Sequence, residues 1–157
     1  MDAFSDVLRV IRLVGGVFLE AEFTAPWRFN GKLSADQCKP FLVTPRHVIA
    51  SHFLAAGNMQ LRIEGGDAID VRAGEFVLLP HNDAHIFGSD LNAPLVSARE
   101  VMHPPSGGGI SRIKYGGGGA AAQLLCGYLR SDAPFSPLLS PLPSVLELDV
   151  GATPSRA

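Results

Sequence analysis

A chain of 157 residues, 46% hydrophobic and 18% charged, is long enough to bury one core without disulfide or metal crosslinks, which excludes a disordered protein. Thirteen Lys and Arg against fifteen Asp and Glu give a formal charge of −2, so the basic surplus of a nucleic-acid-binding surface is absent. Seventeen Gly and twelve Pro predict many turns and short elements, which favours an all-β architecture.

The cysteines and the absence of a targeting pattern indicate the cellular compartment. Cys38 and Cys126 form no spacing pattern, and the N-terminus has no signal-peptide pattern. No apolar run approaches the roughly 20 residues of a membrane span. We therefore expect a soluble cytoplasmic protein with reduced thiols and no membrane partner.

The first element in chain order is a short amphipathic helix. Its apolar stripe comprises Phe4, Val7, Leu8, Ile11 and Val14, with Asp2 placed to cap the helix and two glycines at 15–16 to end it. From residue 17 the pattern changes to short apolar or alternating runs separated by Gly, Pro, Asn and Asp, as expected for strands of a sandwich or closed barrel. These runs are 17–23, 41–43, 48–54, 59–64, 69–72, 76–79, 85–87 and 123–129.

Two segments depart from this rhythm. Residues 104–122 combine Pro, Ser and Gly with a small strand over 110–115, which predicts a flexible Gly-rich loop region on the surface. Residues 135–150 mix Pro with Leu and predict a turn plus a short strand. We take 1–157 as a single domain.

A histidine follows a strand-ending proline in the segment 74–85, Gly-Glu-Phe-Val-Leu-Leu-Pro-His-Asn-Asp-Ala-His. Gly74 provides a hairpin turn, Pro80 ends the strand, and His85 begins the returning strand with its ring toward the barrel mouth. This spacing resembles the second cupin motif, which implies an all-β cupin (RmlC-like jelly-roll) barrel with a short N-terminal helix and short C-terminal helical turns.

The first cupin motif is only partly matched. His52 occupies a position similar to one histidine of that motif, whereas Leu54 and Asn58 stand where the family has a second histidine and a glutamate. Metal-binding cupins hold their ion with three histidines and a carboxylate, so this chain retains at most two matching groups.

A finer resemblance is to the cupin sensor domain of AraC-type transcription regulators. Four stretches carry it in chain order: Ser-Asp-Val-Leu at 5–8, Ala-Pro-Trp at 25–27, the segment 74–85, and Leu-Leu-Cys-Gly-Tyr at 124–128 followed by Leu-Leu at 138–139 and Leu-Pro at 142–143. The resemblance implies a ligand-sensing, self-associating domain joined to a C-terminal DNA-binding domain of helix-turn-helix units. We expect that domain to be missing here, since seven residues follow Val150.

The candidate ligand-binding residues are His52, His85, Trp27 and Tyr128. Imidazoles suit a divalent transition metal such as Zn or Ni, and Cys126 is a third candidate ligand because alternation places it on the same strand face as Tyr128. Each has an ordinary structural alternative: hydrogen-bonded histidines in the barrel mouth, a small buried thiol, and an indole that covers one barrel end. His81 and Asp83 fit exposed turn positions, and Glu20 and Glu22 fit a solvated face.

Three functions are compatible with these residues. The first is a non-enzymatic domain that binds a small-molecule effector, forms a homodimer and makes no direct contact with nucleic acid. The second is a metal-dependent cupin enzyme of the dioxygenase or isomerase type. The missing histidine and glutamate count against this hypothesis. The third is a dimerisation module whose barrel is filled by its own side chains.

Overall fold

The computed structural model describes residues 14–31, 47–103, 109–131 and 140–150, and within them almost all regular structure is β. The strands of the larger sheet are β1 (Val14–Thr24), β3 (His47–Ala56), β6 (Glu75–Leu79), β8 (Met102–His103), β9 (Ser111–Gly116), β10 (Ala121–Ser131) and β11 (Leu146–Asp149). Those of the smaller sheet are β2 (Arg28–Asn30), β4 (Asn58–Ile63), β5 (Ile69–Arg72) and β7 (His85–Gly88). One four-residue helix, α3 (Ala98–Val101), precedes β8.

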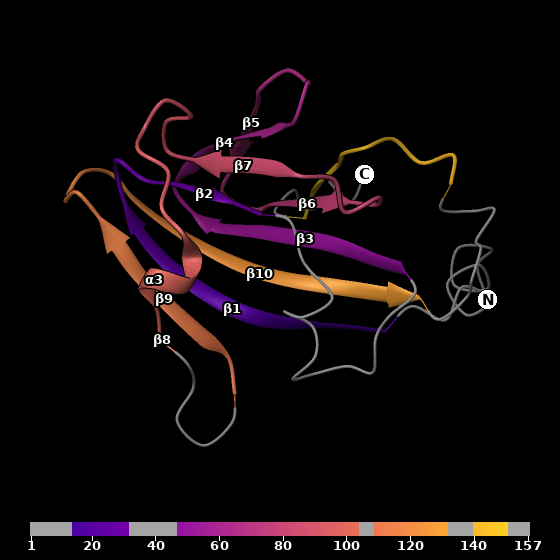
Figure 1. The fold of residues 1–157 in the computed structure, drawn as a ribbon, viewed down its shortest axis with the longest axis horizontal. Coiled ribbons are helices and arrows are strands. Elements are labelled where there is room, and N and C mark those ends of the chain that lie inside the picture. The colour runs from indigo at the N-terminus through magenta and orange to yellow at the C-terminus, as the bar shows by residue number, and fades with distance from the viewer. Residues whose placement is uncertain (1–13, 32–46, 104–108, 132–139, 151–157) are drawn as a thin grey trace, which may run out of the picture.

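The two sheets form two layers with the core between them (Figure 1). The larger sheet has the order β11-β6-β3-β10-β1-β9-β8, and the smaller sheet has the order β2-β7-β4-β5. The predicted all-β fold is confirmed, and β3 to β7 coincide with the strands expected over 48–87. No helix among the described residues has the length and apolar character needed to span a bilayer.

The N-terminal predictions are only partly covered by the described residues. The predicted helix lies outside them except for Val14, which is the first residue of β1, so that strand begins before residue 17. The strand expected over 41–43 also lies outside the described residues. In the described C-terminal segment 140–150, turns lead into β11, as predicted for a turn plus a short strand.

Within the described residues 109–122, strand β9 overlaps the small strand predicted over 110–115, and a glycine turn joins it to the start of β10 in the larger sheet. Strand β9 runs parallel to β1 with Leu19 opposite Ser111 and Thr24 opposite Gly116. Ile113 and Tyr115 alternate toward the core, and the glycines form the turn into β10. A side chain at Gly116 would collide with Thr24, so glycine here permits close approach to β1 rather than mobility.

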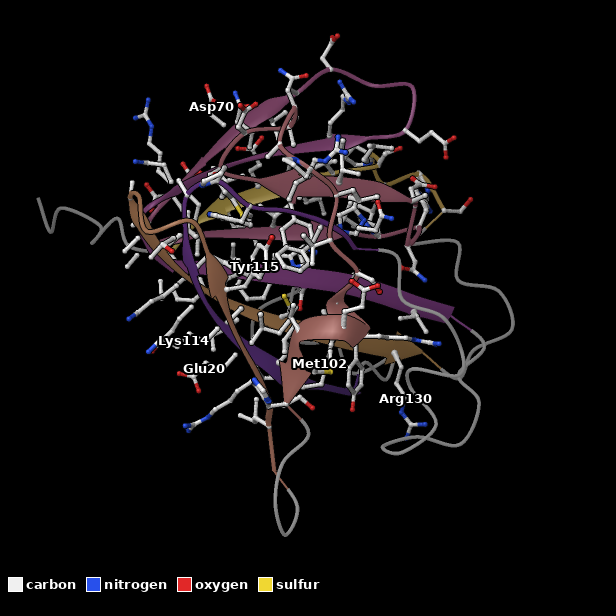
Figure 2. All side chains as sticks on the ribbon, turned by 60° about the vertical axis from the view of Figure 1, so that its left-hand side comes forward. Glu20, Asp70, Met102, Lys114, Tyr115 and Arg130 are labelled. Atoms are coloured by element: carbon white, nitrogen blue, oxygen red, sulfur yellow. The ribbon has the colours of Figure 1, made fainter. Side chains whose placement is uncertain are left out.

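The outer faces of these strands differ in character along the larger sheet. Glu20 and Lys114 point outward from β1 and β9 (Figure 2), and Glu20 lies 3.8 Å from Arg112 across the same pair of strands. The predicted solvated face around Glu20 and Glu22 therefore agrees with the structure. Farther along, the outer side of β3 is covered by a small apolar cluster comprising Ile49, Leu78, Leu129 and Leu142.

Aromatic side chains fill one end of the space between the sheets. Trp27 stacks on Phe23 with ring centroids 4.1 Å apart, and Phe29 lies 5.0 Å from Phe23. All three are at most 2% exposed, and burial of one such side chain stabilises the fold by about 1.5–3 kcal/mol. Trp27 therefore covers one barrel end, which was the structural alternative for this residue.

Candidate functional site

His52 and Cys126 meet on the inner face of the larger sheet. The two residues are directly opposite each other in the antiparallel register of β3 and β10, so alternation turns both side chains toward the core. Nδ1 of His52 lies 3.2 Å from Sγ of Cys126, and both residues are less than 5% exposed. Cys126, which was a candidate ligand from the sequence, therefore lies beside His52.

His85 reaches the same point from the smaller sheet. It is the first residue of β7, which follows a tight turn where Asn82 takes a positive φ of 50°. Its Nε2 lies 2.8 Å from Nε2 of His52, a contact that crosses from one sheet to the other. The two histidines, predicted for the barrel mouth, therefore meet in the buried space between the sheets.

The hydrogen bonds of this group have one direction when both rings are neutral. Nδ1 of His85 lies 2.9 Å from the carbonyl oxygen of Asp83, which can only accept, so Nδ1 carries the proton and Nε2 accepts. His52 must then donate from Nε2 and accept at Nδ1. Cys126 accordingly donates its S–H to His52, and the chain runs from thiol to His52 to His85 to the Asp83 carbonyl.

Burial keeps all three side chains neutral. Burial in the core, followed by repulsion from His85, holds the pKa of His52 well below its usual value. Burial also lowers the pKa of His85, although the Asp83 carbonyl and carboxylate oppose that shift. Burial raises the pKa of the Cys126 thiol to about 12. At neutral pH the group is therefore an uncharged hydrogen-bonded chain rather than a reactive thiolate–imidazolium pair.

A cavity of about 60 Å³ adjoins this chain between the sheets. His52 and Cys126 contribute to its wall, and the rest is mainly apolar side chains from both sheets and α3, including Phe23, Phe29, Phe87, Ala98, Met102 and Leu124. A bulge between Val17 and Leu19 in β1 allows two consecutive residues, Phe18 and Leu19, to line the same cavity. Met102 lies beside α3 (Figure 2), which closes that side.

An open groove of about 750 Å³ lies on the other side of the histidine pair. His85 lines this groove together with Arg62 and Glu64, whereas His52 lines the internal cavity. Asn30 lines both spaces. The contact between the two rings therefore stands between the cavity and the surface.

The structure separates the other two predicted ligand-binding residues from this cavity. Trp27 belongs to the buried aromatic cluster, and its Nε1 has no hydrogen-bond partner among the described residues. Tyr128 is half-buried on β10 and stacks with Phe18, with ring centroids 6.3 Å apart. Neither residue is among the described residues that line the cavity.

The proposed metal ligands do not surround a common point. Cys126 contacts Nδ1 of His52, whereas His85 contacts Nε2, at opposite edges of the ring. The two Nε2 atoms are 2.8 Å apart, and a tetrahedral zinc with bonds of about 2.0–2.1 Å needs them roughly 3.3 Å apart. No group of three or more His, Cys, Asp or Glu side chains suited to an ion occurs in the described ranges. This donor set fits a metal poorly, and Cys126 does not complete it.

Two contributors to the site were missed from the sequence. The Asp83 backbone carbonyl orients His85, although only the side chain of Asp83 was considered. Gly31 lies against the imidazole of His85, because a Cβ at residue 31 would overlap Nε2 of that ring. Local patterns contain no indication of this contact, which joins the chain after β2 to the start of β7.

A mostly antiparallel two-layer β-fold with inward-facing histidines beside an internal cavity is the architecture of a small β-barrel domain. A family model described as Cupin matches residues 2–157, and the chain belongs to the cupin family. No curated protein sequence matches the chain.

Proposed function

We propose that this cupin domain binds a small-molecule effector in the cavity beside His52 and serves as the sensing domain of an AraC-type transcription regulator. The observation that carries the proposal is the buried chain from Cys126 through His52 to His85, located between an internal cavity and an open groove. A ligand that displaces one ring changes contacts in both sheets, because His52 and His85 belong to different sheets. Differential affinity for two such arrangements is the requirement for a sensor.

Binding rather than catalysis is favoured by the state of the side chains. A buried thiol with a pKa raised to about 12 is a poor nucleophile, and each nitrogen of His52 already has a partner. The regulator class is supported by the ordered resemblance of the four stretches described above. We further propose a cytoplasmic homodimer in which DNA contact belongs to a separate C-terminal domain.

A ligand screen by thermal shift tests the sensing proposal. The expected result is a rise in Tm with a subset of compounds, and loss of that rise in His52→Ala. His103→Ala is the matched control, because His103 is exposed on β8 and does not line the cavity. A broad panel of compounds without any stabilising member, or equal ligand response in both variants, would contradict ligand binding at this site.

Light scattering and the encoding gene test the regulator class. A dimer at micromolar concentration, and a reading frame that continues beyond residue 157 into two helix-turn-helix patterns, are expected. A monomer at high concentration, together with a gene that lacks such patterns, would refute the class while leaving ligand binding open.

The second candidate is a metal-dependent cupin enzyme, favoured by two histidines that converge in the core of a cupin domain, and it requires their Nε2 atoms to move apart from the 2.8 Å contact. His52 and His85 are the residues that would hold Zn or Ni. Elemental analysis of purified protein distinguishes this alternative, since an enzyme of this type requires close to one equivalent of metal per chain. Metal well below one-tenth of an equivalent after metal-supplemented growth rejects it.

A further inference from the structure

We infer that the cavity takes a small uncharged ligand with an apolar body and at most one neutral polar end, directed toward Asn30. This inference rests on the proposal that the cavity is a ligand site, and it specifies the chemical class of the ligand. It follows from what the wall contains, from which of its polar atoms are already bonded, and from the size of the space.

The described part of the wall offers no charge to pair with a charged ligand. Among the described residues that line the cavity there is no Asp, Glu, Lys or Arg, and the polar side chains are limited to Asn30, His52 and Cys126. An unpaired charge transferred from water to an apolar site has a large desolvation cost. The described part of the wall therefore disfavours a carboxylate, phosphate or ammonium group and favours an uncharged one.

The buried polar side chains at the cavity already have hydrogen-bond partners. His52 accepts from Cys126 and donates to His85, and His85 donates to the Asp83 carbonyl. A ligand that hydrogen-bonds either ring must first break one of these buried contacts and leave a partner unsatisfied. The sides opposite this chain consist of Phe, Leu, Ile and Met side chains, which favour aromatic or aliphatic groups.

Asn30 is the remaining polar group, and its place defines the orientation of the ligand. It is exposed, and it lines both the cavity and the open groove. Its amide both donates and accepts, so it suits a hydroxyl or a carbonyl. A ligand with its apolar body inward contacts the apolar wall, and a neutral polar end on that ligand can hydrogen-bond to Asn30.

The size of the cavity limits the buried part of the ligand. A cavity needs about 10–15 Å³ to hold one water molecule, so this cavity of about 60 Å³ holds about four to six non-hydrogen atoms. Benzene and butan-1-ol fall in this range. Butyrate and butylammonium have similar bodies but carry a charge at pH 7.5, which makes the four compounds a matched series.

Methionine methyl NMR reads binding at this cavity directly. The chain has three methionines; Met102 lines the cavity, whereas Met59 is buried in the core away from its lining. Protein labelled with ¹³C-methyl methionine is titrated with each compound, and Met102→Leu assigns the resonance. We expect benzene and butan-1-ol to shift the Met102 methyl in a saturable manner, with butyrate and butylammonium at least tenfold weaker.

Cavity-filling variants link the shift to this space. Ala98→Leu adds three carbons at the wall beside α3, and Ala50→Val adds two from β3 should the first variant fold poorly. Either is expected to weaken benzene binding at least tenfold. Ala55→Leu is the matched control, because Ala55 is exposed on β3 and lies outside the lining.

The outcomes separate this inference from the proposed function. Saturable shifts with butyrate or butylammonium equal to those with butan-1-ol would overturn the ligand class and leave sensing intact. Shifts from benzene that persist in the filling variants would place binding elsewhere and overturn the inference. No saturable shift from any of the four compounds would overturn the inference and also count against a ligand site in the barrel.

Discussion

Substitution of Gly31 by Ala is expected to uncouple the two histidines. A Cβ at this position overlaps Nε2, Cε1 and Cδ2 of His85, each at well under 3.0 Å, so the ring must move by about 1 Å or more to reach ordinary contact. The contact between the two Nε2 atoms is 2.8 Å, and a shift of that size takes it outside the range of a hydrogen bond. The substitution acts through the site rather than through the backbone, because Gly31 does not have a positive φ.

The expected loss of stability combines two terms. A buried hydrogen bond broken so that a partner is left unsatisfied costs about 1–3 kcal/mol. Overpacking of a well-filled interior costs about 1–3 kcal/mol. We therefore expect the free energy of unfolding of Gly31→Ala to fall by about 2–6 kcal/mol.

Urea unfolding followed by tryptophan fluorescence measures this change, with Trp27 as the single tryptophan. Gly66→Ala is the matched control, because its Cβ meets only Ile63, with the carbonyl oxygen at 3.4 Å and Cβ at 3.9 Å. Restriction of the unfolded chain makes this substitution neutral or slightly stabilising. Equal unfolding free energies for the two variants, with unchanged histidine ring resonances, would refute the role assigned to Gly31.

Three further predictions concern the same buried group and its neighbour. In ¹H–¹⁵N spectra at pH 7.5, His52 is expected as the Nε2–H tautomer and His85 as the Nδ1–H tautomer; the opposite assignment for either ring would contradict the deduced direction of the hydrogen bonds. The pKa of both histidines is lower in the folded state than in the unfolded state, so the unfolded state binds more protons below about pH 6.5. The free energy of unfolding should therefore decrease as the pH falls, by up to about 1.4 kcal/mol per pH unit for each histidine. The raised pKa of Cys126 has the opposite consequence, a loss of stability above about pH 9, so a free energy of unfolding that does not change from pH 5 to 10 would be inconsistent with neutral burial of the group. Trp27→Phe should lower the free energy of unfolding by only about 1–2 kcal/mol, measured by thermal unfolding, because the indole N–H has no partner among the described residues. Trp27→Ala should lower it by about 3–5 kcal/mol. Equal losses in the two variants would show that this N–H is bonded.

The strands and their inward faces were accessible from the sequence because alternation and turn residues are local properties. The runs at 48–54, 59–64 and 69–72, each bounded by Gly or Asn, became β3, β4 and β5. The spacing from Gly74 to Pro80 to His85 located a histidine at the start of a strand, and alternation along β10 placed Cys126 inside. These inferences require only the neighbouring residues in the chain.

Residues 109–122, the described part of the glycine-rich segment, show what composition alone leaves open. Glycine-rich sequence predicts mobility when nothing restrains it, yet β9 pairs in parallel with β1, far away in the chain. Gly116 permits that pairing because any side chain there would overlap Thr24. The role of a glycine depends on what lies opposite it, and this is decided by the packing of distant strands.

The sequence by itself determined the all-β class, the family motif and the residue types available to the site. Only the tertiary structure decided that His52 and His85 meet across two sheets, that Cys126 takes the other edge of the His52 ring, and that the Gly31 backbone lies against His85. Contacts between sheets depend on register, bulges and layer spacing, which are set by the packing of the whole core. No pattern within a single strand specifies them.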